Sequence, residues 1–159
     1  MRLPKQVLII PYRMINDKVE YCIFRRKDME VWQWISGGVE DFDKDIISAA
    51  KREVCEETGI TQDVNITKLE GFTKIPVVNI VKEFKWGEDI FYSDEYSFAV
   101  NIYDKNIKIS EEHSEFKWIS PVPFFFLKIA LAIRGFLYFH TNLEIICSSS
   151  VKNVARILL

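Results

Sequence analysis

The stretch from Gly37 to Ile60, which reads GGVEDFDKDIISAAKREVCEETGI, constrains the fold of this chain more than any other. A Gly-Gly turn opens it, a run rich in helix formers follows, and Gly59 ends that run. We expect a helix over residues 43–58, with Asp43 as its N-cap. A helix of this length needs an apolar surface to pack against, so the rest of the chain must supply one.

The predicted helix has two distinct faces. Its apolar stripe, expected to pack on a sheet, consists of Ile47, Ala50 and Val54. Its acidic face consists of Glu53, Glu56 and Glu57, which fall within an arc of about 100°. Crowded carboxylates repel one another, and a hard divalent cation such as Mg²⁺ or Mn²⁺ turns that cost into a binding site. The alternative for an acidic cluster is an ordinary solvated helix face.

Strand-forming runs lie on both sides of this helix. We expect a hairpin turn at Asn16-Asp17 and a further turn at 36–38, before the helix. The expected strands are 6–13, 18–26, 31–35, 65–74, 77–84, 96–103 and 117–119, with a loop at 86–93. This order predicts an α/β protein with a mixed sheet and helices on its faces. The length of 159 residues suits a single domain over 1–159.

The composition narrows the class of protein. Apolar residues make up 48% of the chain, and the net charge is −2, which argues against disorder. The same charge argues against nucleic-acid binding driven by bulk positive charge. The three cysteines, Cys22, Cys55 and Cys147, are scattered and suggest free thiols. The N-terminal apolar run is too short for a secretory signal, so a cytoplasmic protein is expected.

The stretch that opened this section resembles the Nudix box, G-x5-E-x7-R-E-U-x-E-E-x-G-U, where U is a bulky apolar residue. The positions that match in register are Gly38, Arg52, Glu53, Val54, Glu56, Glu57, Gly59 and Ile60. One position departs, because Lys44 stands where the box has its first Glu, and Asp43 lies one residue earlier. The resemblance implies the Nudix fold, an α/β/α sandwich with a mixed β-sheet and the box at the edge of the sheet.

This resemblance also implies an activity. Nudix hydrolases split a diphosphate linkage by attack of water on phosphorus, usually with Mg²⁺, and Mn²⁺ is an alternative. The implied metal ligands are Glu53, Glu56, Glu57 and the backbone carbonyl of Gly38. Glu53 and Glu57 are the strongest candidates, and Arg52 is expected to orient a box carboxylate. Lys44 is expected to weaken support of the site, with Asp43 taking part of the missing role.

A second acidic segment, Ile109 to Trp118, carries the pattern Glu-His-x4-Trp. It resembles the segment where many Nudix proteins place a loop carboxylate facing the metal. Glu112 is therefore the candidate for a further metal ligand or the general base. The substitutes considered are Glu111, Glu115 and, more weakly, Glu95. For His113 we expect a local hydrogen bond, and for Trp118 core packing.

Clues to the substrate lie just before the box. Arg25 and Arg26 suit phosphate groups, although an exposed basic strand end is equally ordinary. Trp32-Gln33 offers a ring that stacks on a base or pterin, or one that is merely buried. The chain resembles MutT-like members acting on dihydroneopterin triphosphate or nucleoside triphosphates. The competing hypothesis is a catalytically silent Nudix-fold nucleotide-binding module.

The segment 121–140, PVPFFFLKIALAIRGFLYFH, is strongly apolar and aromatic. Lys128, Arg134 and Gly135 argue against a membrane span. We expect a C-terminal helix that covers the sheet. Contact with a membrane surface and burial in a homodimer are the alternatives for this segment. A third hypothesis for function is a membrane-surface or scaffold protein that uses this segment and keeps the box as a relic.

Overall fold

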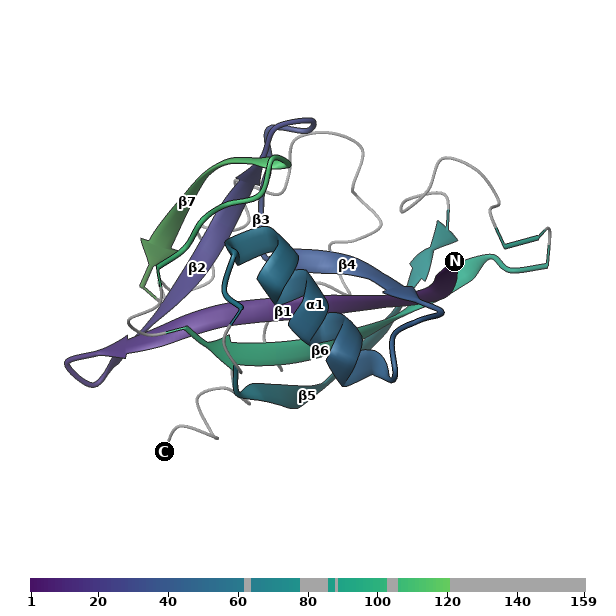
Figure 1. Cartoon of the computed structure of the whole chain (residues 1–159), viewed down its shortest axis with the longest axis horizontal. Helices are drawn as coiled ribbons and strands as arrows, with labels where there is room; N and C mark the ends of the chain where they lie inside the picture. The colour runs from purple at the N-terminus through teal and green to yellow at the C-terminus, as the bar shows by residue number, and fades with distance from the viewer. Residues whose placement is uncertain (62–63, 78–85, 88, 103–105, 121–159) are drawn as a thin grey trace.

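In the part of the chain that it describes, the computed structural model has one mixed sheet with one helix across one of its faces (Figure 1). It describes residues 1–61, 64–77, 86–87, 89–102 and 106–120. The strands are β1 (Arg2–Ile15), β2 (Lys18–Arg26), β3 (Trp32–Gln33), β4 (Ile35–Glu40), β5 (Ile66–Pro76), β6 (Tyr92–Asn101) and β7 (His113–Ile119), and the helix is α1 (Ile46–Thr58). This arrangement confirms the α/β class and the mixed sheet.

Strand β1 is the centre of the sheet. The strand order is β3-β2-β1-β6-β5, with β4 also paired to β1 and β7 to β2. The pairing of β1 with β6 is parallel, whereas those with β2 and β4 are antiparallel. The predicted hairpin is confirmed, because Asn16 and Asp17 have φ of 49° and 59° between β1 and β2. Two successive positive φ angles match the two-residue turn that suits the twist of a hairpin.

The helix begins three residues later than predicted, at Ile46. Asp45 is its N-cap, and its carboxylate accepts hydrogen bonds from the Ser48 backbone N–H at 2.7 Å and the Ser48 hydroxyl at 2.8 Å. The predicted N-cap, Asp43, is therefore wrong, because its side chain bonds Arg52 instead. Gly59 ends the helix as predicted, with a left-handed φ of 67° that a side chain would oppose.

The buried stripe of α1 is also shifted from the prediction. Ala49, Ala50 and Val54 are fully buried against β1 and β4, whereas Ile47 is 41% exposed. The later start of the helix leaves Ile47 on the rim, and Ile46 packs against the core instead. Ala49 and Ala50 are small, which suits a close approach of α1 to the sheet.

The predicted turn at 36–38 is wrong, because these residues belong to β4. Val7 of β1 is the register partner of Gly37, and Gln6 is that of Gly38. The reason for glycine here is space, since a Cβ on Gly37 would lie 1.9 Å from the Glu53 carboxyl carbon. The glycine pair therefore brings the sheet against the acidic face of α1.

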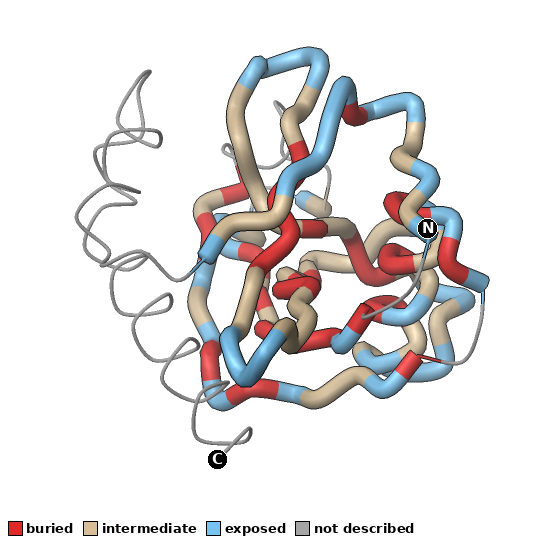
Figure 2. Tube along the Cα trace, turned by 90° about the vertical axis from the view of Figure 1, so that its left-hand side faces the viewer, coloured by how far each residue is buried: buried red, intermediate tan, exposed pale blue. Residues whose placement is uncertain are grey.

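The two faces of the sheet carry separate cores, and buried segments run through the middle of the molecule (Figure 2). The face toward α1 contains Val7, Ile9 and Phe98. The opposite face contains Ile10 and Ala99, packed with partly buried Trp34 and others. The predicted helix at 121–140 lies outside the described residues, as does most of the predicted strand at 77–84.

Two of the cysteines are described, and both are free thiols. Cys22 is buried in the core and Cys55 is half-buried on α1, while Cys147 lies outside the described residues. Within the described part of the chain, no helix has the length and apolar character needed to cross a bilayer.

Candidate functional site

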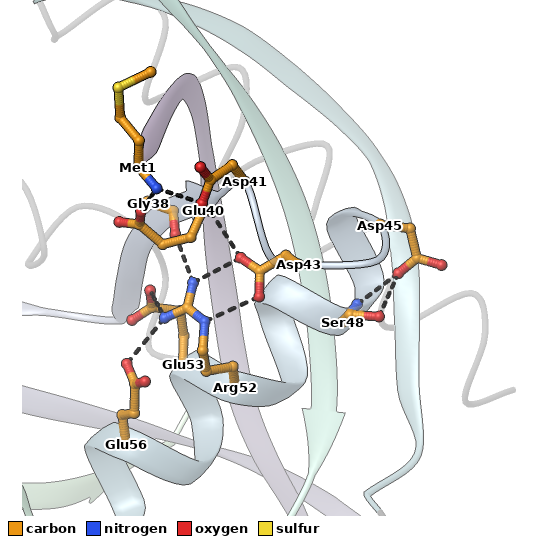
Figure 3. A network of polar contacts seen from close by, with 10 residues as sticks. All are labelled: Met1, Gly38, Glu40, Asp41, Asp43, Asp45, Ser48, Arg52, Glu53 and Glu56. Carbon is orange, nitrogen blue, oxygen red and sulfur yellow. Dashed lines mark hydrogen bonds and ion pairs between the residues drawn. The ribbon is translucent and has the colours of Figure 1, made fainter.

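Arg52, in the middle of α1, is the centre of a polar network that joins the helix to the loop before it and to β4 (Figure 3). Its Nε and Nη2 donate to the two oxygens of Asp43 at 3.0 and 2.9 Å. Nη2 also donates to the Gly38 carbonyl at 2.7 Å, while Nη1 donates to Glu53 at 2.8 Å and Glu56 at 3.0 Å. One guanidinium thus ties the loop before the helix, the end of β4 and two carboxylates of the box together.

Asp43, one residue before Lys44, is the carboxylate that contacts Arg52 in the loop before the helix. Its side chain is only 4% exposed, and it accepts a second contact from the Glu40 backbone N–H at 2.8 Å. The hydrogen bonds from Arg52 hold the pKa of this carboxyl below its usual range, against the opposing effect of burial. Lys44 is exposed, and the structure places it outside this network. Although Lys44 stands where the box has its first glutamate, Arg52 therefore still has a carboxylate partner, Asp43, in the loop before the helix.

Glu53 and Glu56 differ in their surroundings although both contact Arg52. Glu53 is 7% exposed and lies against Gly37, whereas the Glu56 side chain is 56% exposed. Burial raises the pKa of Glu53, and the Arg52 contact opposes that rise without cancelling it. A buried carboxylate that costs free energy to ionise is one that an added cation would stabilise.

Glu57 is fixed by partners that approach from another part of the chain. Its Oε2 accepts from the Ser110 hydroxyl at 2.8 Å and lies 2.6 Å from Nδ1 of His113. The backbone N–H of Ser110 also donates to the Glu57 carbonyl at 3.2 Å. Burial raises the pKa of Glu57, but the contacts with His113 and Ser110 outweigh it, so the pKa lies below the usual range. The carboxylate is therefore held ionised in one orientation.

Sequence reasoning assigned His113 a local hydrogen bond and gave Ser110 no role. His113 does contact Ser110, with 3.2 Å between its Nδ1 and the hydroxyl, but its main partner is Glu57. The signal in the sequence was the pair Glu112-His113, whose histidine is the first residue of β7. Nothing in the sequence indicated that residues 106–113 fold back onto the end of α1. There the Lys108 N–H donates to the Thr58 carbonyl at 2.8 Å.

The predicted carboxylate Glu112 lies near this cluster but is exposed. Its side chain is 58% exposed and forms an ion pair with Arg26 at 3.4 Å. Arg26 also makes two hydrogen bonds with Asp28, at 2.8 and 2.9 Å. Arg25 forms an ion pair at 3.0 Å with Glu115, which was one of the residues considered in place of Glu112. Both candidate phosphate ligands thus already have carboxylate partners, which a phosphate would have to replace.

The aromatic candidates for substrate contact lie on or beside β3. Trp32 carries the Lys117 ammonium group 3.7 Å from its ring centroid, an arrangement typical of a cation–π contact. Gln33 is half-buried and is the register partner of Phe24 in β2. Neither residue contacts the carboxylates of α1 in the structure. Trp118 stacks with Arg13, whose guanidinium carbon lies 4.0 Å from its ring centroid, and packs against the core as predicted.

The donor groups along α1 fit a hard divalent cation, because all of them are oxygens. Among the described residues, no three Asp, Glu, His or Cys side chains converge on a common point that would enclose a metal. Mg²⁺ is usually bound by one or two carboxylates, waters and substrate phosphates, so a closed protein cage is not required. Glu53 and Glu57, buried and one turn apart, are the donors best fixed for this role.

Glu95, the weakest of the substitutes for Glu112, lies elsewhere. It is the register partner of Gln6, which donates to its Oε2 at 3.0 Å. The next residue along β6, Tyr96, packs against the core on the α1 side, so the alternation of the strand turns Glu95 to the other face. Glu95 is therefore separated from the acidic face of α1 by the sheet.

Burial of Glu95 gives a prediction for stability. Desolvation raises its pKa from 4.5 to about 7, although the contact with Gln6 opposes the rise. Since the unfolded chain releases this proton earlier, the native state loses about 2–3 kcal/mol as the pH rises from 5 to 8. Glu95→Gln should remove that loss, and urea unfolding at both pH values measures it. Asp94→Asn is the control, and an equal pH slope in Glu95→Gln and wild type would contradict the assignment.

Comparison with known proteins identifies the family of this chain. The family model described as NUDIX domain matches residues 6–135. The chain therefore belongs to the Nudix hydrolase family, as the box predicted.

Three relatives illustrate the similarity. The chain is 30% identical over 112 residues to the asymmetrical bis(5'-nucleosyl)-tetraphosphatase of Mus musculus, covering 70% of each protein. It is 32% identical to a crystal structure described as a NUDIX hydrolase from Listeria monocytogenes, with a TM-score of 0.65 over 74% of this chain and 78% of that one. Dihydroneopterin triphosphate pyrophosphohydrolase of E. coli, at 18% identity, shares the fold, with a TM-score of 0.63 over 92% of this chain and 97% of that one.

Proposed function

We propose that this protein is a pyrophosphohydrolase that splits a diphosphate linkage by attack of water on phosphorus. The substrate class is a nucleoside triphosphate, dihydroneopterin triphosphate or a related nucleoside-diphosphate derivative. Mg²⁺ is the proposed metal, Mn²⁺ a substitute, and the cytoplasm the proposed location. The observation that carries the proposal is the network of Arg52 with Asp43, Glu53 and Glu56, in which Asp43 is the carboxylate partner of Arg52 that Lys44 cannot be.

The proposed roles follow from the contacts of each side chain. Glu53, Glu56 and Glu57 would hold a divalent cation, which when bound neutralises phosphate oxygens and lowers the pKa of a coordinated water. Arg52 fixes Glu53 and Glu56, and its link to the Gly38 carbonyl fixes β4 against the helix. Because Arg52 already binds Gly38, this carbonyl would join the metal only as a shared acceptor.

Proton transfer from the attacking water is assigned to Glu112. This carboxylate is exposed and lies on the segment that also carries Ser110 and His113, the partners of Glu57. Its ion pair with Arg26, at 3.4 Å, is looser than the contacts within the Arg52 network and is exposed to solvent. Release of Glu112 from Arg26 would leave Arg26 free to pair with a substrate phosphate.

A silent nucleotide-binding module is the competing function. Both functions require the Nudix fold, and they differ in turnover. The test is release of phosphate or pyrophosphate from a panel of nucleoside triphosphates, dihydroneopterin triphosphate and a dinucleoside tetraphosphate, with Mg²⁺ or Mn²⁺. The dinucleoside compound is included because the mouse relative is named for it. Turnover that EDTA abolishes supports the hydrolase, whereas binding without turnover on every substrate supports the module.

His113 gives a prediction within this proposal. His113→Phe keeps the ring packed against Phe24, whose centroid lies 5.4 Å away, but removes the contact with Glu57. Since partners that orient a metal ligand are worth about 10–100-fold in affinity, Mn²⁺ binding should weaken by that factor. Electron paramagnetic resonance titration of free Mn²⁺ measures it, with Phe116→Leu as the packing control. Unchanged affinity would show that His113 does not orient Glu57.

A further inference from the structure

Strand β7 presents an open edge of the sheet (Figure 1). In the described part of the chain, β7 pairs with β2 on one side and with no strand on the other. The register between β7 and β2 is regular from Glu115 to Ile119, because its irregularity falls before Glu115. Residues 114–117 are all exposed. An exposed edge strand carries a row of backbone N–H and C=O groups that can pair with a strand of another chain.

The edge at β5 differs, because it carries features that oppose such pairing. The register of β5 with β6 is interrupted between Lys68 and Phe72, which marks a bulge. The strand ends at Pro76, which has no backbone N–H to donate. Bulges, prolines and lysines are the usual means by which proteins prevent pairing between sheet edges. Residues 115–119 of β7 contain no proline and keep a regular register with β2, so β7 is the edge better suited to accept a strand.

The side chains of β7 alternate between an aromatic face and a charged face. Phe116 and Trp118 lie on the face toward α1, where both rings contact core residues. Glu115 and Lys117 lie on the opposite face, where the Lys117 ammonium group is 3.7 Å from the ring centroid of Trp32. Residues directly opposite each other in an antiparallel pair share a face. A strand that pairs with β7 must therefore match an aromatic ring on one face and two charges of opposite sign on the other.

A second copy of β7 meets both requirements, because Glu115 and Lys117 flank Phe116 symmetrically. When two β7 strands run antiparallel about a two-fold axis at Phe116, Glu115 of each copy lies opposite Lys117 of the other. The two Phe116 rings then lie side by side on the aromatic face, as a favourable cross-strand pair. A shift of two residues in either direction places Lys117 opposite Lys117, or Glu115 opposite Glu115, and like charges in these positions are destabilising. Charge therefore selects one register.

We propose that β7 is the interface of a symmetric dimer of this chain, in which two β7 strands pair about Phe116 and join the two sheets. The interface does not use the carboxylates of α1, so it is independent of the proposed hydrolysis. Because the paired segment is short, the buried area belongs to the class of weak interfaces below about 1,200 Å². We therefore expect a reversible dimer that forms at protein concentrations of about 100 μM and above and dissociates on dilution.

The experiment is sedimentation velocity of the full chain over a concentration series, with charge-reversal variants. Lys117→Glu places two carboxylates opposite each other at both ends of the pairing, so it should raise the Kd of the dimer at least about tenfold. Glu115→Lys should do the same with two ammonium groups. A 1:1 mixture of these two variants should dimerise again, because every carboxylate then lies opposite a lysine. Lys68→Glu makes the same charge change on the edge strand β5 and should leave the Kd unchanged.

A mixture of Lys68→Glu with Glu115→Lys has the same net charges and should not recover the dimer, which separates pairing at β7 from general attraction between variants. A wild-type chain that stays monomeric up to about 1 mM would overturn the proposal, as would a dimer that Lys117→Glu does not weaken. Unfolding midpoints identify a single variant that fails to fold. The double variant Glu115→Lys/Lys117→Glu then decides, because it restores opposite charges at both positions. It should dimerise like wild type, and a monomer would overturn the proposal.

Discussion

Glu57→Gln is expected to lower kcat at least about a thousandfold while leaving the protein folded, since loss of a metal-holding carboxylate removes several kcal/mol of transition-state stabilisation. The reason is specific to this residue. Its Oε2 is held by Ser110 and His113, so the carboxylate is already oriented before any ligand binds. A glutamine amide oxygen can still accept from these partners, but the negative charge is lost.

The measurement is the steady-state rate with Mg²⁺ on the best substrate of the panel, together with the unfolding midpoint. Glu70→Gln, on an exposed position of β5, is the matched control and should keep both values near wild type. A Glu57→Gln enzyme with unchanged turnover would refute the assignment of Glu57 to the metal. A variant that unfolds at the assay temperature is recognised by its midpoint, and Mn²⁺ affinity below that temperature then decides the assignment.

Asp43→Ala is expected to destabilise the protein by about 2–3 kcal/mol, because it removes a buried partner of Arg52. The Asp43 side chain is 4% exposed and accepts from Arg52 twice and from the Glu40 backbone once. The loss stays below the largest values for broken buried pairs because Arg52 keeps its contacts with Gly38, Glu53 and Glu56. Urea unfolding at neutral pH provides the free energy.

The companion change, Lys44→Glu, should alter stability by less than about 0.5 kcal/mol, since Lys44 is exposed. It should also leave turnover unchanged if Asp43 fills the role of the box glutamate. The double variant Asp43→Ala/Lys44→Glu tests which position matters. Recovery of stability or rate in the double variant would show that a glutamate at residue 44 can replace Asp43 as the partner of Arg52, whereas wild-type stability and rate in Asp43→Ala alone would contradict the assignment to Asp43.

The match to the box predicted the family and the cluster of charges, because it records residues close together in sequence. Arg52, Glu53 and Glu56 lie within five residues on one helix, so helical geometry alone brings them together. The partners of Glu57 were harder to predict, because they lie 53 or more residues further along the chain. Their position depends on how 106–113 returns to the end of α1.

The N-cap was missed because Asp43 and Asp45 both suit that position by sequence. Asp43 does not cap the helix because its carboxylate accepts hydrogen bonds from Nε and Nη2 of Arg52 instead. The glycine pair was read as a turn for a similar reason. Local propensity favours a turn, but Gly37 and Gly38 are kept in β4 by pairing with β1, and Gly37 leaves room for Glu53.

The most direct test of the central proposal is hydrolysis in ¹⁸O-labelled water with Mg²⁺, followed by mass spectrometry of the products. The proposal predicts that one ¹⁸O atom enters one of the two phosphate products of each cleaved diphosphate linkage, and that EDTA and Glu57→Gln both stop incorporation. Absence of metal-dependent incorporation on every substrate of the panel, or label found in the sugar or ring instead of the phosphate, would contradict it.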